Sequence, residues 1–263
     1  MTLIPAAHKI PWIGTSWKMN KTRSQAQHFA QTLEASPIVH SSAVQPFVIP
    51  PFPYIAEVAS LLKGTKVKVG AQNMHWETQG AWTGEISPIM LKDCAATLVE
   101  LGHSERRTHF AETDETVALK TKAALDHGLI ALVCIGDTRE EYERDQTAQA
   151  LEKQVRALLK YVSADAKDKV LIAYEPVWSI GIGGTPASPE FANEQHKKIS
   201  TLVQDITGSS LPILYGGSVN ADNCVALANQ PHIDGLFIGR AAWDVAGFLE
   251  IINSVVQSQG HNK

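Results

Sequence analysis

Three side chains that can take part in proton transfer each follow a short apolar run of the sequence. Lys18 lies in "IGTSWKMNK", His103 in "ELGHSERR" and Glu175 in "LIAYEPVWSIG". A carboxylate at the end of an apolar strand is costly to bury unless it is paired or used, as a general base is. Backbone N–H groups at a helix start disfavour an imidazolium, so a histidine there can act as a neutral donor.

Taken singly, each of these residues also fits a structural role. Lys18 alone fits a solvated lysine just beyond a strand, and His103 alone fits a hydrogen-bonded histidine of the core. A metal site is not expected at His103, because His109 is not spaced to share a helix face with it and no cysteine or carboxylate cluster accompanies it. We therefore expect no metal, and proton transfer by carboxylate and imidazole requires no other cofactor.

Two glycine turns near the C-terminus are candidates for phosphate binding. "YGGS" contains Gly216, Gly217 and Ser218, and "IGR" contains Gly239 and Arg240. Glycine permits close approach of the backbone, and exposed N–H groups at a helix start bind phosphate without needing a cation. Because each turn ends a strand and precedes a helical segment, the two together predict a phosphate site.

Two further segments leave alternatives open. The residues after Glu175 pair a rigid entry at Pro176 with a glycine-rich exit, which is typical of a closing lid but equally of a plain surface loop. Trp76 and Trp82 in "NMHWETQGAWTGE" fit either local packing or a subunit interface, and we favour the interface. Cys134 in "VCIG" is interpreted as a small core residue rather than a nucleophile.

The elements that must position these residues alternate along the chain. Most of the strand candidates are continuous runs of aliphatic residues, which is typical of parallel strands covered on both faces. Ser188 and Pro189 predict a helix start, the segment "TDETVALKTKAALDHG" a helix that ends at Gly128, and spaced leucines and valines at 151–162 another helix. The strand candidates span 11–16, 47–51, 66–73, 97–103, 129–136, 170–176, 212–218 and 235–240.

Eight strand-and-helix units in a chain of 263 residues predict an α/β fold, a single (β/α)8 TIM barrel with residues 1–263 as one domain. A doubly wound open sheet is the alternative, but its glycine-rich fingerprint after the first strand is missing. Active sites of such barrels lie at the C-terminal ends of the strands, where the candidate residues fall.

Composition narrows the partners. A formal charge of -4 without a basic run argues against nucleic acid or an anionic membrane, and no apolar stretch reaches membrane-spanning length. Three widely spaced cysteines and the absence of a signal-peptide pattern indicate a reducing, cytoplasmic location. An anionic small substrate would have to be bound by local groups.

The motifs together resemble the triosephosphate isomerase family over nearly the whole chain. The resemblance rests on "SWKMN", "GAQN", "GAWTGEIS", "ELGHSERR", "AYEPVWSIG", "YGGSVN" and "DGLFIG". It implies that Glu175 is the base, His103 the neutral electrophile and Lys18 the cation facing the substrate. It further implies supporting roles for Glu105 and Ser104, and a phosphate site made by Gly181, Ser218, Gly216, Gly217, Gly239 and Arg240. A homodimer is implied as well, formed through the loop that carries Asn73, Trp76, Trp82, Thr83 and Glu85.

Departures from the family pattern bear on the substrate, a small phosphorylated ketose or aldose. Ser16 replaces the usual asparagine before "WKMN", Gly184 the usual lysine of the lid exit and Arg240 a glycine, and Asp137 is the acid after "CIG". The smaller Ser16 would enlarge the pocket at the reacting carbons. "TSWKMNK" and "GAQNMHW" also resemble the branch assigned to L-erythrulose 1-phosphate, which is associated with erythritol breakdown. We therefore expect that substrate over a triose phosphate of glycolysis.

Two other readings carry less weight. An inactive barrel kept as a binding or scaffold protein would have no reason to retain Lys18, His103 and Glu175 together. An aldolase would need a Schiff-base lysine on a central strand, and glutamate occupies the end of the sixth strand candidate.

Overall fold

Eight parallel strands close into one barrel in the computed structural model, which describes residues 10–163, 165–180 and 184–260. The strands follow one another in sequence order, and β1 closes the barrel by pairing with both β2 and β8. The (β/α)8 architecture predicted from the sequence is thereby confirmed. The strands are β1 (Trp12–Ser16), β2 (Gln45–Ile49), β3 (Lys68–Ala71), β4 (Leu98–Leu101), β5 (Ile130–Ile135), β6 (Val170–Tyr174), β7 (Ile213–Tyr215) and β8 (Gly235–Ile238).

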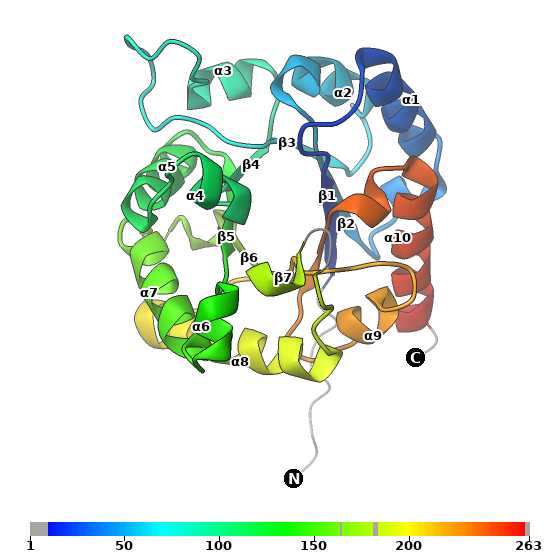
Figure 1. The fold of residues 1–263 in the computed structure, drawn as a ribbon. Coiled ribbons are helices and arrows are strands. Elements are labelled where there is room, and N and C mark those ends of the chain that lie inside the picture. The colour runs from blue at the N-terminus through cyan, green and yellow to red at the C-terminus, as the bar shows by residue number, and fades with distance from the viewer. Residues whose placement is uncertain (1–9, 164, 181–183, 261–263) are drawn as a thin grey trace.

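The helices form a ring outside the barrel (Figure 1). They are α1 (Arg23–Glu34), α2 (Ile55–Leu61), α3 (Pro88–Asp93), α4 (Ser104–His109), α5 (Asp114–Asp126), α6 (Arg139–Glu143), α7 (Thr147–Leu159), α8 (Pro189–Thr207), α9 (Cys224–Ala228) and α10 (Val245–Gly260). Short 3-10 turns are η1 (Pro37–His40), η2 (Phe52–Tyr54), η3 (Lys167–Lys169), η4 (Val177–Ser179) and η5 (Arg240–Ala242). No helix in the described part of the chain is long and apolar enough to cross a membrane.

Alternation along each strand sends one set of side chains into the barrel and the other beneath the helices. On β4, for example, Val99 and Leu101 belong to the apolar layer under the helices, whereas Leu98 belongs to the barrel interior. The interior is a packed core whose members are Phe47, Ile49, Leu98, Leu132, Cys134, Leu171, Ala173, Leu214 and Phe237. The barrel interior is therefore filled with side chains. Cys134 is one of them, as the sequence predicted.

Helix caps follow the sequence signals. The Ser188 side chain accepts from the backbone of Phe191 at the start of α8, with Pro189 in the first turn. Thr113 and Thr116 form a capping box at the start of α5, and Gly128 just beyond its end has a left-handed φ of 72°. These local interactions fix where the chain returns to the barrel.

Strand β1 ends at Ser16 as the sequence predicted, whereas the other seven strands end earlier than predicted. The third ends at Ala71 rather than Asn73, and the fourth at Leu101 rather than His103. The residues just beyond turn away because their side chains bond elsewhere: Gln72 donates to the Lys18 carbonyl, and His103 caps α4. Polar residues thus lie just beyond the strand ends, at the C-terminal side of the barrel.

Candidate active site

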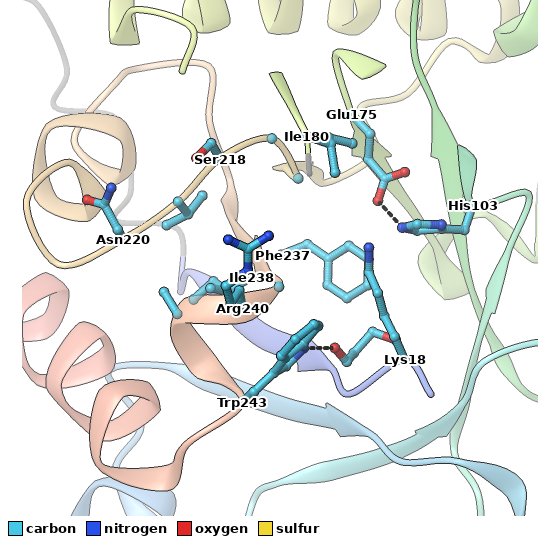
Figure 2. Close-up of a pocket in the computed structure, with 16 residues that line it drawn as sticks. Lys18, His103, Glu175, Ile180, Ser218, Asn220, Phe237, Ile238, Arg240 and Trp243 are labelled. Carbon is cyan, nitrogen blue, oxygen red and sulfur yellow. Dashed lines mark hydrogen bonds and ion pairs between the residues drawn. The ribbon is translucent and has the colours of Figure 1, made fainter. Parts of the chain in front are cut away.

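A cavity of about 310 Å³ opens at the C-terminal ends of the strands. This volume is at the lower end of the range of roughly 300–1,000 Å³ typical of small-molecule sites. In Figure 2, Lys18, His103 and Glu175 gather on one side of the cavity, with Ser218 and Asn220 on the other. Of the predicted site residues, the cavity brings together Ser16, Lys18, His103, Glu175, Gly216, Gly217, Ser218, Gly239 and Arg240.

Glu175 directly follows β6, and its side chain points inward as Ala173 does. It is only 2% exposed, and its backbone N–H continues the sheet by donating to Ile135 across 2.8 Å. Gly216 makes room for it: a Cβ at this position would lie 2.8 Å from Glu175 Cγ. The N–H of Gly216 donates to the Tyr174 carbonyl, so in this conformation the glycine provides space rather than a free donor.

His103 occupies the N-cap of α4, and the hydrogen bonds define its tautomer. Its Nδ1 accepts from the backbone N–H of Glu105 at 3.1 Å, so Nδ1 carries no proton and Nε2 is the donor. The Nε2 atom lies 3.5 Å from Glu175 Oε1. A neutral imidazole donor and a carboxylate acceptor thus face the same point of the cavity, which is an arrangement able to polarise a carbonyl and take a neighbouring proton.

Lys18 has a left-handed backbone, with a φ of 52°. The amide of Gln72 donates to the Lys18 carbonyl at 2.9 Å and to that of Ile49 at 3.2 Å, which holds this uncommon conformation. The ammonium group contacts Glu105 Oε1 at 2.6 Å, and the Lys18 side chain is 23% exposed. Burial opposes ionisation of Glu105, but the hydrogen bond and charge of Lys18 outweigh it and lower the pKa of that carboxyl. Ser104 is the first residue of α4 and is half-buried.

Ser16 ends β1 with its side chain turned into the barrel, where it forms part of the cavity wall. The indole Nε1 of Trp243 donates to the Ser16 carbonyl at 3.0 Å, and Trp243 itself lines the cavity. The sequence analysis did not single out Trp243. Its contact joins segments far apart in the chain, so no local pattern marks it.

The turns after β7 and β8 line the opposite side of the cavity. The Asn223 side chain donates to the Ser218 carbonyl at 2.9 Å and fixes the first turn. Arg240 is exposed at the start of η5, and Figure 2 shows its guanidinium extending into the cavity. A cation is therefore present beside the predicted phosphate turns, where the sequence analysis relied on backbone N–H groups alone.

The segment after Glu175 is anchored at its start by Asp137. Trp178 Nε1 donates to Asp137 Oδ2 at 3.1 Å, and the Tyr174 hydroxyl donates to Oδ1 at 3.0 Å. Burial raises the pKa of Tyr174, and the Asp137 charge adds to the effect. Gly184 has no room for a side chain, because a Cβ would lie 2.4 Å from the Ser179 carbonyl oxygen. Gly181, with its predicted phosphate contact, lies outside the described residues.

The predicted dimer loop projects from the barrel between β3 and α3 (Figure 1). Trp82 is 49% exposed, whereas Trp76 is half-buried and packs against the core, so local packing explains part of this segment. The His75 ring lies between them, with ring centroids 4.2 Å from Trp76 and 4.4 Å from Trp82. At the loop base, Asn73 is buried and accepts from Lys120, and the residues left exposed at its tip include Thr83 and Glu85.

Glu100 is a site residue that the sequence analysis missed. It lies in the inward row of β4, two positions beyond Leu98, and is 3% exposed. Burial raises the pKa of Glu100 to about 7; the charge of His103 opposes this shift and that of Glu175 adds to it. A single glutamate inside the apolar run "TLVELGH" gave the only signal, and an inward or outward orientation could not be assigned to it from the sequence.

A (β/α)8 barrel that brings a carboxylate, an imidazole and an ammonium group to one cavity is built for isomerisation by proton transfer. The family model for triosephosphate isomerase matches residues 11–255. The chain belongs to the triosephosphate isomerase family, and it is an isomerase.

Three similar proteins share one name. The chain is 57% identical over 242 residues to an L-erythrulose-1-phosphate isomerase of Brucella abortus, covering 92% of this chain and 94% of the relative. It is 54% identical over 242 residues to one of Rhizobium rhizogenes, with 92% and 93% covered. It is 53% identical over 248 residues to one of Rhizobium meliloti, with 94% and 97% covered.

Proposed function

We propose that the chain converts L-erythrulose 1-phosphate into D-erythrulose 4-phosphate through an enediol. The observation that carries this proposal is Ser16, a small residue in the cavity wall beside Lys18 and in the place of an asparagine. A tetrulose phosphate differs from dihydroxyacetone phosphate by a hydroxymethyl group on the carbon that loses its proton, and the smaller side chain leaves space for this group. The names of the similar proteins support the same substrate.

We propose the catalytic roles from the geometry. Glu175 takes the proton from the carbon that carries the hydroxymethyl group, and His103 donates its Nε2 proton to the neighbouring carbonyl oxygen. Glu175 then returns the proton to the former carbonyl carbon, while the imidazole moves a proton between the two oxygens. Carbonyl and alcohol exchange places, so no oxidant or other cofactor is required. Lys18 stabilises the negative charge that develops on oxygen, and Glu105 holds Lys18 in place.

The opposite side of the cavity is proposed to hold the phosphate. Gly217, Ser218 and Gly239 present backbone to it, and the Arg240 guanidinium adds a charge that can bind phosphate through two hydrogen bonds. With the phosphate on that side, the reacting carbons are proposed to lie on the other side of the cavity, where His103 and Glu175 face one another (Figure 2). Gly216 is assigned the separate task of leaving room for the base.

We further propose that the chain forms a single-domain barrel and that two copies form a homodimer in the cytoplasm. The dimer would act in erythritol breakdown rather than in glycolysis. Large apolar side chains remain exposed near the site: Met19, adjacent to Lys18, is 96% exposed, and Phe110 after α4 is 63% exposed. Together with Trp82 of the projecting loop, they supply apolar surface that a second copy would cover. Sedimentation of the purified protein tests this, and a monomer at micromolar concentration would contradict it.

Product identification tests the reaction itself. L-Erythrulose 1-phosphate is incubated with the protein in deuterated water, and the carbon NMR spectrum of the mixture is followed. We expect the carbonyl to move by one carbon, with solvent deuterium at the carbon that receives the proton, because a carboxyl proton exchanges with solvent. The alternative, a triosephosphate isomerase, predicts an unchanged tetrulose spectrum under conditions that convert glyceraldehyde 3-phosphate into dihydroxyacetone phosphate.

A further inference from the structure

Glu100 lies in the barrel interior directly below the candidate active site. Its Oε2 atom is buried and has no hydrogen-bond partner among the described residues. A carboxyl group with an unpaired buried oxygen costs free energy, and an aliphatic side chain here would complete the apolar interior formed by Leu98 and its neighbours. The chain thus keeps a destabilising group under its active site, which is a pattern typical of functional residues.

The groups that face Glu100 come from several strand ends. His103 follows its own strand, Glu175 follows β6, Lys18 follows β1, and Cys134 lies on β5. The Ser16 side chain lies within hydrogen-bonding reach of Glu100, and this proximity favours the ionised form of the carboxyl. Ser16 lines the cavity whereas Glu100 lies beneath it, so the serine hydroxyl is the link between the buried carboxyl and a bound substrate.

A serine hydroxyl on its own rotates freely and can donate or accept in several directions. Here the Ser16 backbone carbonyl accepts from Trp243, and the Ser16 hydroxyl has the buried Glu100 carboxyl within hydrogen-bonding reach. When the O–H bond points at the carboxylate, the oxygen lone pairs of Ser16 are left for the cavity. Glu100 therefore defines Ser16 as an acceptor aimed at the substrate.

We propose that Glu100 is a positioning residue for substrate selection, which orients the Ser16 hydroxyl to accept a hydrogen bond from the terminal hydroxyl of a four-carbon ketose phosphate. This inference rests on the proposed function and adds a partner to Ser16. A three-carbon substrate lacks that hydroxyl and leaves the Ser16 acceptor unpaired. Space alone admits the larger substrate, whereas a positioned acceptor prefers it, because sites built to bond a hydroxyl discriminate against ligands that lack it.

The test is a double-mutant cycle on selectivity. The ratio of kcat/KM for L-erythrulose 1-phosphate to kcat/KM for glyceraldehyde 3-phosphate is measured for the wild type, Glu100→Leu, Ser16→Ala and the double variant. We expect Glu100→Leu to lower the ratio by about 10- to 100-fold, the value of a hydrogen bond to a well-oriented group. In the Ser16→Ala background the same change should lower the ratio by less than about threefold, because Glu100 acts through Ser16.

Glu100→Gln keeps the protein measurable if leucine disturbs the barrel. It preserves the shape of the side chain but removes its charge, and we expect a smaller fall of the ratio together with loss of its pH dependence around neutrality. Equal losses on both substrates would overturn the inference, because they would mean that Glu100 only supports the base. The same fall in both Ser16 backgrounds, or no fall at all, would also overturn it.

The wild-type ratio of the two kcat/KM values tests the proposed function separately from the role of Glu100. A wild-type ratio below one contradicts L-erythrulose 1-phosphate as the substrate, whatever the variants do. Coupling between Ser16 and Glu100 is read from the change of the ratio between backgrounds. A wild-type ratio far above one without coupling would retain the substrate and reject Glu100 as a positioning residue.

Discussion

The imidazole Nε2 of His103 lies 3.5 Å from Glu175 Oε1, and the two residues reach this position from the ends of different strands. The N-cap position of His103 determines which ring nitrogen donates, and Gly216 leaves room for the Glu175 side chain. The pairing of donor and base is thus a consequence of the barrel, because parallel strands end at the same edge.

Glu175→Gln tests the assignment of the base. We expect kcat to fall by about 100- to 10,000-fold on either sugar phosphate, because an amide cannot take the proton. The measurement is steady-state isomerase kinetics, with Glu143→Gln on the exposed end of α6 as the matched control. Activity that survives Glu175→Gln or Glu175→Ala undiminished would place the reaction at another site.

Ser16→Asn tests the steric basis of substrate choice. Restoring the larger side chain should shift the ratio of kcat/KM values at least about tenfold toward glyceraldehyde 3-phosphate, because the hydroxymethyl group loses its space. Ser16→Ala removes the hydroxyl but keeps the space, so its ratio should fall by about the same 10- to 100-fold as that of Glu100→Leu, without exclusion of the hydroxymethyl group. An unchanged ratio in Ser16→Asn would reject the steric explanation.

Arg240→Gly tests the cation at the phosphate turns. We expect KM to rise about tenfold and kcat to change less, because the guanidinium contributes a charged hydrogen bond to the phosphate rather than to the reacting carbons. The KM of Arg240→Lys should lie between those of the wild type and Arg240→Gly, since an ammonium group keeps the charge but not the paired N–H donors of a guanidinium. A fall in kcat with unchanged KM would contradict phosphate binding by Arg240.

Stability is expected to depend on pH through Glu100. Its pKa is raised from 4.5 to about 7, chiefly by burial, so the native protein binds more protons than the unfolded chain between these values. The contribution of Glu100 to the free energy of unfolding is therefore most favourable below about pH 4.5. It becomes less favourable by roughly 3 kcal/mol in total as the pH rises through 7.

Urea unfolding of the wild type and Glu100→Gln between pH 5 and 8 measures this effect, using roughly linear extrapolation to water at each pH. The difference between the two proteins should move in favour of the variant as the pH rises, since glutamine cannot ionise. A difference that is independent of pH would show that Glu100 titrates as an ordinary surface carboxyl.

Asp137→Ala tests the anchor of the segment that follows Glu175. The substitution leaves the buried donors of Trp178, Tyr174 and Thr147 without their acceptor, which should lower the free energy of unfolding by at least about 2 kcal/mol. Thr147→Val removes one of these bonds and should cost less. Equal stability of Asp137→Ala and the wild type in chemical denaturation would contradict an anchoring role.

Local patterns were enough to predict the strands, the caps at Ser188 and Thr113, and the places where Lys18, His103 and Glu175 occur. Apolar runs, capping residues and glycines act over a few neighbouring positions, so they can be recognised without the fold. The strand ends were predicted too long because Gln72 and His103 bond to groups that only the closed barrel brings near.

Other site features depend on contacts between distant segments. Trp243 meets Ser16 across the closure of the barrel, and Trp178 meets Asp137 between consecutive strand ends. Glu100 is the clearest case: its orientation depends on the register of β4 relative to Leu98, and its raised pKa depends first on burial and then on charged neighbours. These features follow from the three-dimensional arrangement rather than from any motif.

The most direct test of the central claim is the pair of kcat/KM values of the wild-type protein, one for L-erythrulose 1-phosphate and one for glyceraldehyde 3-phosphate. Both are measured on one preparation, with Glu175→Gln as the blank for contaminating isomerase. The account predicts a large preference for the tetrulose phosphate. A large preference for the triose phosphate would contradict it and would make Ser16 a neutral variation in a triosephosphate isomerase.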